Sequence, residues 1–455
     1  MFETVLVANR GEIAVRVIRT CQRLGIKAIA VYSEADAGAL HVRLADEAVL
    51  LGPAPAAESY LDAVRVIEAA RVVGAEAVHP GYGFLAENAD FARRVAAAKL
   101  VWVGPPPAAM EAMGDKVTAR NTMAAAGLPV LPGSTDGLTD LAAATAAAAE
   151  IGYPVMVKAA GGGGGIGMSS VDSERGLRSA FETARTRAER FFGSPAVLLE
   201  RYLPHARHVE VQVLGLADGR VVALGDRDCS VQRRHQKVAE ESPSPRIPPR
   251  LRERLLAAAV QAALAVDYRG AGTVEFLVPD SGGGDELPDS FYFLEMNTRL
   301  QVEHPVTELV TGIDLVEEQL RVAAGQPPTF DPVNPPEPAG HAIELRVYAE
   351  DPRRFLPGPG VITVWEEPAG EGIRVDSGYS AGDTVTPYYD PLLAKLCVWG
   401  ADRGEALARA RSAVAGFHVE GPKCNLPFFT ELLANDEFVS GRYDTGLVPR
   451  MRARS

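Results

Sequence analysis

Paired cysteines are lacking in this 455-residue sequence, which has four cysteines in all. Cys21, Cys229, Cys397 and Cys424 lie far apart and form no Cys-x-x-Cys pair. This spacing argues against a zinc site, an iron–sulfur site and a disulfide framework. We therefore interpret them as buried thiols and expect a cytoplasmic protein.

Long apolar runs and positive charge are also scarce. No segment reaches the roughly 18 apolar residues of a membrane-spanning helix, and the N-terminal MFETVLVANRGE does not have the pattern of a signal peptide. The net charge is −13, so no overall field would draw the chain to nucleic acid or anionic lipid. We expect neither a membrane nor a nucleic acid as partner, and we expect local lysines and arginines to hold any anionic substrate.

The length predicts two or three domains. Over residues 1–103, β-branched runs alternate with helical patterns, which predicts a parallel sheet with crossover helices. Proline and glycine breaks then bound a helical linker over 104–130 and a small domain over 131–202. In the small domain we expect a helix over 141–150, a strand over 154–158, a second helix and a closing strand over 197–200. Longer alternating strands over 203–446 predict an antiparallel sheet half exposed to a cleft, and 447–455 are expected to be a frayed tail.

Five consecutive glycines, Gly161 to Gly165, follow Lys158 and lie between two predicted strands. Such a loop can present backbone N–H groups to phosphate oxygens and close over them as a lid. No Gly-Lys-Ser/Thr follows, so it is not a Walker A loop, and it is not a GxGxxG turn that opens a helix. A flexible linker is the alternative.

Polar residues recur at every second position from Glu295 to Glu303. On an extended backbone, this period places one set of side chains on one face: Glu295, Asn297, Arg299, Gln301 and Glu303. Glu275 lies in mid-strand among apolar neighbours, where a lone carboxylate is costly to bury. Across a sheet from Glu295 and Asn297, it would complete an oxygen-only site for Mg²⁺ or Mn²⁺ that bridges nucleotide phosphates. Salt bridges from these carboxylates to arginines are the alternative.

The segment from Asp228 to Lys237 concentrates four potential cations in an acidic protein. A solvated basic strand is the usual explanation of such a run. The other explanation is that Lys116, Lys158 and Lys237 together neutralise a triphosphate and a bicarbonate.

Several long segments closely resemble biotin carboxylase, the ATP-grasp component of acetyl-CoA carboxylase and related biotin-dependent carboxylases. In chain order they are ANRGEIAVR from Ala8, HPGYGFLAEN from His79, MGDK from Met113, GGGGG from Gly161, RDCSVQRRHQK from Arg227, GAGTVEF from Gly270, EMNTRLQVEHPVTE from Glu295 and PYYDPLLAKL from Pro387. The resemblance covers nearly the whole chain. It implies a three-domain ATP-grasp fold of α/β and α+β class, with an N-terminal Rossmann-like domain, a small lid domain and a C-terminal antiparallel-sheet domain.

The resemblance also implies a set of site residues. The ATP contacts would be Lys116, Lys158, Gly164, Gly165, Met168, Glu200, Leu203, His208, Gln232 and His235. Two Mg²⁺ or Mn²⁺ ions would lie at Glu275 and Glu295, with Asn297 nearby. The bicarbonate ligands would be Lys237, Arg299, Gln301 and the Val302 backbone.

For the chemistry, the resemblance implies that Glu303 deprotonates bicarbonate, which attacks the γ-phosphate of ATP while Arg299 stabilises the oxyanion. The products would be ADP and carboxyphosphate. Carboxyphosphate would release CO₂, and the phosphate would take the proton from N1 of biotin. Arg346 would stabilise the enolate-like ureido oxygen, with Tyr82 close to the biotin ring.

Two segments depart from the family pattern. Ile166 stands where a basic residue usually follows the glycines, and Ser169-Ser170 replaces a basic–apolar pair. The loss of positive charge predicts weaker ATP binding or slower lid closure. Arg23, one turn from Arg19, stands where acetyl-CoA carboxylase members tend to have an acidic residue in a dimer contact. A homodimer is still expected.

Two other functions share part of this pattern. Another ATP-grasp ligase, such as half of a carbamoyl-phosphate synthase or a carboxylate–amine ligase, would have the same metal carboxylates and phosphate lysines, but EMNTRLQVEHP and Arg346 favour biotin. A non-catalytic ATP-binding subunit fits Ile166, but every expected catalytic position is filled. No Ala-Met-Lys-Met sequence occurs. We therefore expect the biotin on a separate carboxyl carrier protein or in a longer polypeptide, and a carboxyltransferase that selects the acceptor, an acyl-CoA or pyruvate.

Overall fold

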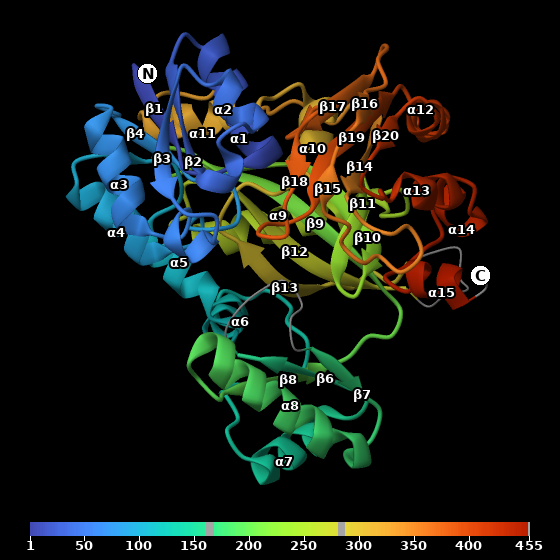
Figure 1. The fold of residues 1–455 in the computed structure, drawn as a ribbon. Helices are drawn as coiled ribbons and strands as arrows, with labels where there is room; N and C mark the ends of the chain where they lie inside the picture. The colour runs from blue at the N-terminus through green and yellow to red at the C-terminus, as the bar shows by residue number, and fades with distance from the viewer. Residues whose placement is uncertain (161–167, 281–286, 454–455) are drawn as a thin grey trace.

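The N-terminal region of the computed structural model, which describes residues 1–160, 168–280 and 287–453, is built on a parallel sheet (Figure 1). The strand order is β3-β2-β1-β4-β5, and every pair is parallel. Its elements are β1 (Thr4–Val7), α1 (Gly11–Arg23), β2 (Lys27–Ser33), α2 (Leu40–Leu44), β3 (Glu47–Gly52), α3 (Ala63–Val72), β4 (Ala77–His79), α4 (Ala89–Ala97) and β5 (Val101–Trp102). The parallel sheet with crossover helices that the alternation predicts is confirmed.

The turn between β1 and α1 lies at the carboxyl edge of this sheet, where ligand sites of α/β folds gather. Gly11 starts α1 with a φ of +64°, a conformation that suits glycine. Asn9 Nδ2 donates to the carbonyls of Pro80 and Tyr82, each at 2.7 Å. These bonds tie the loop after β4 to the turn, so that Tyr82 lies next to Glu12.

Two helices follow the parallel sheet, α5 (Pro107–Gly114) and α6 (Lys116–Ala125), where we predicted one helical linker. The chain breaks at Asp115, whose side chain accepts a hydrogen bond from Thr118 N at 2.8 Å and caps α6. Lys116 is therefore the first residue of a helix.

The small region that hangs below the rest of the molecule in Figure 1 has the antiparallel sheet β7-β6-β8. Its elements are α7 (Leu141–Ile151), β6 (Val155–Ala159), β7 (Ser169–Val171), α8 (Glu174–Phe192) and β8 (Val197–Arg201). The sequence predicted all of these except β7, which is short and begins with two serines. The glycine run and Ile166 lie outside the described residues, so the hypothesis of a less basic lid stays a prediction.

A large antiparallel sheet in the order β13-β12-β9-β10-β11-β14-β19-β17 forms the body of the molecule. Its strands are β9 (Ala206–Gly215), β10 (Val221–Arg233), β11 (Gln236–Ser242), β12 (Gly270–Pro279), β13 (Tyr292–Asn297), β14 (His341–Tyr348), β17 (Ile373–Ser377) and β19 (Leu392–Gly400). The expectation that this sheet is half exposed is wrong for β9, because every residue of that strand is buried. One face of β9 packs on α9 (Pro249–Leu264), and the other carries a buried polar network that lies against α10 (His304–Thr311).

The remaining α-helices and strands lie outside the large sheet. They are α11 (Leu315–Ala323), β15 (Gly360–Val361), β16 (Val364–Glu366), β18 (Thr384–Val385), α12 (Arg403–Ala415), β20 (His418–Glu420), α13 (Leu426–Leu433), α14 (Asp436–Val439) and α15 (Leu447–Ala453). The prediction of a frayed tail over 447–455 is wrong for α15, because Leu447 and Val448 are buried in the core. Within the described ranges, no helix is long and apolar enough to cross a membrane.

Candidate active site

A partly buried lysine surrounded by three carboxylates forms the centre of the site. Lys237 Nζ lies 2.6 Å from Glu210 Oε2, 2.6 Å from Glu275 Oε1 and 2.7 Å from Glu303 Oε1. Burial alone would lower the pKa of Lys237, but the three carboxylates raise it well above its usual value. This lysine is a fixed positive charge in a predominantly anionic pocket.

The turn that presents Lys237 explains its position. Arg234 and His235 both have positive φ and join β10 to β11. Both are exposed, whereas Lys237 points into the sheet face. The explanation as a solvated basic strand therefore holds for the turn and is wrong for Lys237.

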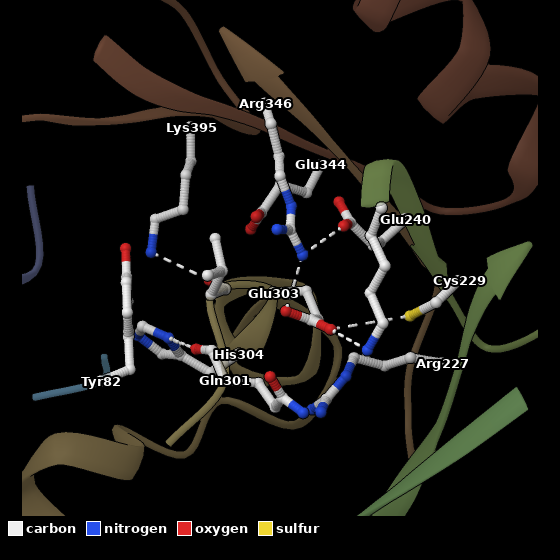
Figure 2. A network of polar contacts seen from close by, with 12 residues as sticks. Tyr82, Arg227, Cys229, Glu240, Gln301, Glu303, His304, Glu344, Arg346 and Lys395 are labelled. Atoms are coloured by element: carbon white, nitrogen blue, oxygen red, sulfur yellow. Dashed lines mark hydrogen bonds and ion pairs between the residues drawn. The ribbon is translucent and has the colours of Figure 1, made fainter. Parts of the chain in front are cut away.

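Glu303 is the N-cap residue of α10 and is fully buried. Its Oε2 accepts a hydrogen bond from Arg346 Nη2 at 2.9 Å, while its Oε1 contacts Lys237 (Figure 2). Although burial favours the neutral acid, these cations hold the pKa of Glu303 well below its usual value. The prediction of one extended run from Glu295 to Glu303 is wrong, because β13 ends at Asn297 and the chain turns into α10.

Arg346, on β14, is shared between two carboxylates. Its Nη2 lies 2.6 Å from Glu240 Oε1 as well as 2.9 Å from Glu303 Oε2. Burial raises the pKa of Glu240 to about 7. Glu344 is directly opposite Glu240 in the strand register, and burial also raises its pKa. Figure 2 shows Glu240 and Glu344 on either side of the Arg346 side chain.

The predicted metal ligands lie on neighbouring strands. Glu275 on β12 is directly opposite Glu295 on β13, and Asn297 Nδ2 donates to Glu275 Oε1 at 2.9 Å. Glu275 Oε2 also lies 2.8 Å from His208 Nε2, and Glu275 pairs with lysine and histidine rather than with the arginines of the alternative explanation. Two facing carboxylates and an amide oxygen form a donor set that suits Mg²⁺ or Mn²⁺.

The predicted bicarbonate ligands also converge, although the backbone is not extended. Arg299 Nη1 donates to Gln301 Oε1 at 2.7 Å, and Nη2 donates to Asn297 Oδ1 at 3.2 Å. Glu87, from the loop after β4, accepts from Arg299 Nε at 3.0 Å. Gln301 Nε2 donates to Glu275 Oε1 at 3.2 Å, which joins this group to Lys237.

The lysines predicted to contact phosphate lie at the border of the small region. Lys158 on β6 forms a short ion pair with Glu200 on β8. Lys116 Nζ lies 4.0 Å from Glu295 Oε2. Although His235 is exposed at its turn, neighbouring groups partly desolvate it and lower its pKa, and the positive charges of Lys158 and His208 lower that pKa further.

Of the remaining nucleotide candidates, Gln232 lies next to His208. Gln232 Nε2 and His208 Nδ1 are 2.7 Å apart. Met168 and Leu203 are partly buried near the border of the small region. Gly164 and Gly165 lie outside the described residues.

Sequence reasoning missed two residues that hold this site together. Glu210 and Arg227 are both fully buried, and Arg227 Nε donates to Glu210 Oε1 at 2.6 Å. Arg227 also donates to Thr273 and Thr307, each at 2.9 Å. The alternation of polar and apolar residues in β9 was the signal that Glu210 faces the site, but no partner was assigned to it.

Comparison with known proteins gives matches along almost the whole chain. Family models match residues 1–110 (biotin carboxylase, N-terminal domain), 115–329 (carbamoyl-phosphate synthase L chain, ATP binding domain) and 344–450 (biotin carboxylase C-terminal domain). Biotin carboxylase 2 of Bacillus subtilis is 50% identical over 445 residues, which cover 98% of each chain.

Two solved structures are similar to the whole chain. A biotin carboxylase–βγ-ATP complex from Campylobacter jejuni has a TM-score of 0.95, 44% identity, and 99% coverage of both chains. The biotin carboxylase domain dimer of 2-oxoglutarate carboxylase from Hydrogenobacter thermophilus, in complex with MgADP, ADP and bicarbonate, has a TM-score of 0.94 and 44% identity. That match covers 99% of this chain and 98% of the other.

Proposed function

The chain belongs to the biotin carboxylase family, and we propose that it carboxylates N1 of carrier-bound biotin with ATP and bicarbonate, releasing ADP and phosphate. One observation carries the assignment of roles. The Glu303 carboxylate is held between Lys237, the proposed bicarbonate ligand, and Arg346, the proposed biotin ligand. A base between two cations suits a reaction that first activates bicarbonate and then stabilises the deprotonated ureido group of biotin.

In this proposal ATP lies between the small region and the large sheet. Lys116, Lys158 and His208 would neutralise its phosphates, with Glu200 and Leu203 at the adenine. Glu275 and Glu295, with Asn297 nearby, would hold the metal ions, which supply charge neutralisation at the phosphates when bound. The family resemblance and the facing carboxylates support these roles.

Bicarbonate would bind Lys237, Arg299 and Gln301. It would compete for hydrogen bonds that Lys237 gives to carboxylates, and it would add a negative charge beside Glu303. Both effects raise the pKa of Glu303 from its low value, so that this carboxylate becomes a better proton acceptor as its substrate arrives. Glu303 would then take the bicarbonate proton while the bicarbonate oxygen attacks the γ-phosphate.

Biotin would bind on the side of Glu303 that faces Arg346, away from Lys237. Arg346 would donate to the ureido oxygen as negative charge develops there after loss of the N1 proton to phosphate. Glu240 also forms an ion pair with Arg346, with 2.6 Å between Oε1 and Nη2. In this proposal, Tyr82 lies close to the biotin ring.

The partners belong to the same proposal. We expect a separate biotin carboxyl carrier protein, a carboxyltransferase and a homodimer, in the cytoplasm. Arg23 does not oppose a dimer through repulsion with Arg19, because its Nη2 lies 2.7 Å from Asp314 and 2.8 Å from Glu317. Light scattering of the purified chain tests the dimer.

Bicarbonate-dependent ATP hydrolysis, with and without free biotin, tests the function. We expect bicarbonate to be required and biotin to increase the rate. Absence of biotin stimulation would reject the proposal. A rate that depends on ammonia instead would favour a carbamoyl-phosphate synthase, whose ATP-binding model matches residues 115–329.

A further inference from the structure

A second lysine lies beneath the Glu303 turn. Lys395, on β19, has no exposed surface, and its Nζ donates to the carbonyl of Val302 at 3.0 Å (Figure 2). The same nitrogen lies 3.0 Å from Glu12 Oε2 and 3.8 Å from Asp376 Oδ2. Burying a lysine is costly unless it is paired, so this set of contacts demands an explanation.

The contact with Glu12 connects β19, which carries Lys395, to α1 near the N-terminus. Glu12 belongs to the first turn of α1, and its Oε1 accepts a hydrogen bond from the Tyr82 hydroxyl. Gly378 permits this approach, because a Cβ at that position would lie 2.5 Å from Glu12 N. A continuous path of contacts therefore runs from Tyr82 through Glu12 and Lys395 to Val302.

The path ends on the backbone that presents the base. His304 Nδ1 lies 2.7 Å from Gln301 O and donates to that carbonyl, because a carbonyl oxygen can only accept. The next carbonyl, of Val302, is held by Lys395. Because peptide groups are planar, holding both carbonyls fixes the planes that carry Val302 N–H and lead into Glu303.

We propose that Lys395 is a positioning residue for the carboxylation reaction, which orients the Gln301–Glu303 turn through the Val302 carbonyl and links that turn to Tyr82 through Glu12. This inference rests on the proposed function. It gives a role to the lysine of the PYYDPLLAKL segment, which lies outside the set of residues assigned to substrates. Lys395 touches no substrate in this account and acts through Glu303.

The competing explanation is that Lys395 only neutralises Glu12. A double variant, Lys395→Met/Glu12→Gln, separates the two, because it removes the pair without leaving a buried charge from either partner. Its matched control is Glu12→Gln alone, which keeps the lysine next to Val302 O. The two proteins differ only at Lys395. Thermal unfolding reports whether both fold, and if methionine prevents folding, Lys395→Gln in the same background serves instead, because glutamine is too short to reach Val302.

We expect kcat/KM for bicarbonate in the double variant to fall about 100-fold below that of Glu12→Gln, as misplacement of a catalytic group by about 1 Å can produce. The KM for ATP should stay within about twofold, because the proposed nucleotide ligands lie on other strands. Equal values of kcat/KM for bicarbonate in the two variants would overturn the proposal.

Crystal structures of the two variants give a readout that does not depend on activity. We expect the Glu303 carboxylate to leave hydrogen-bond distance of Lys237 or Arg346 in the double variant only. An unmoved turn would overturn the positioning role. If the wild-type chain showed no bicarbonate-dependent ATP hydrolysis, the proposed function would fail, and the structures would still decide what Lys395 positions.

Discussion

Glu303 and Arg346 form a buried ion pair in which 2.9 Å separate Oε2 and Nη2. The other oxygen of the same carboxylate lies 2.7 Å from Lys237 Nζ. One carboxylate thus connects the cation proposed for bicarbonate with the cation proposed for biotin. In the proposed reaction, both halves would depend on the position of Glu303.

Replacement of the base is the first prediction. Glu303→Gln keeps the size of the side chain but cannot accept the bicarbonate proton, so we expect kcat for bicarbonate-dependent ATP hydrolysis to fall at least about 100-fold. The KM for ATP should be little changed. Glu47→Gln, at an exposed ion pair with Lys27, is the control. Activity of Glu303→Gln within about threefold of wild type would show that another group takes the proton.

Arg346 should matter more for biotin than for bicarbonate. Arg346→Lys keeps the positive charge but loses the planar group that contacts Glu240 and Glu303 together, so the geometry at the ureido oxygen is lost. We expect the biotin-stimulated rate to fall about 100-fold, and the rate without biotin to fall less. An equal decrease in both rates would place Arg346 in the bicarbonate step instead.

Glu295 provides the test of the metal site, because its side chain is partly exposed and its loss should be tolerated by the fold. Glu295→Gln removes one charge from the proposed ligand set. We expect the Mg²⁺ concentration for half-maximal ATP hydrolysis to rise about tenfold, equivalent to about 1.4 kcal/mol. Chelation should abolish wild-type activity, and Mg²⁺ should restore it. An unchanged Mg²⁺ requirement in the variant would remove Glu295 from the ligand set.

The pairing of Glu275 with Glu295 could be predicted from the sequence, because Glu275 is a carboxylate among apolar neighbours in mid-strand and Glu295 lies in another predicted strand. The position of Glu303 could not be predicted from the same period, since the chain leaves the strand after Asn297. The His304-Pro305 pair was the available signal, because proline is favoured in the first turn of a helix. Only the family resemblance assigned Glu303 its role before the structure.

The contact between Glu210 and Arg227 could not be predicted by local reasoning. The two residues are directly opposite each other on β9 and β10, and β10 has an irregularity between Ala223 and Asp226 that shifts the register. A shift by one residue would turn Arg227 to the other face. Register across a bulge depends on packing of the whole sheet, which periodicity within one strand does not report.

The last prediction concerns stability against acid, at a carboxylate on the strand that carries Lys237. Glu241 is buried, and its oxygens lie 2.6 Å and 3.0 Å from Arg403 and 2.6 Å from His341 Nε2. Although burial favours the neutral acid, Arg403 and His341 lower the pKa of Glu241 well below its usual value. A carboxyl group with a lowered pKa in the folded state stabilises the fold fully above its unfolded pKa of about 4.3, and this stabilisation is lost as the pH falls toward the folded pKa.

We expect Glu241→Gln to lower the free energy of unfolding by about 3 kcal/mol at pH 7. The difference from wild type should be constant between about pH 7 and pH 5 and should narrow below about pH 4.3. Urea unfolding of both proteins at pH 7, 5 and 4 measures it, and a difference that narrowed already between pH 7 and pH 5 would mean that the pKa of Glu241 is not lowered in the folded protein.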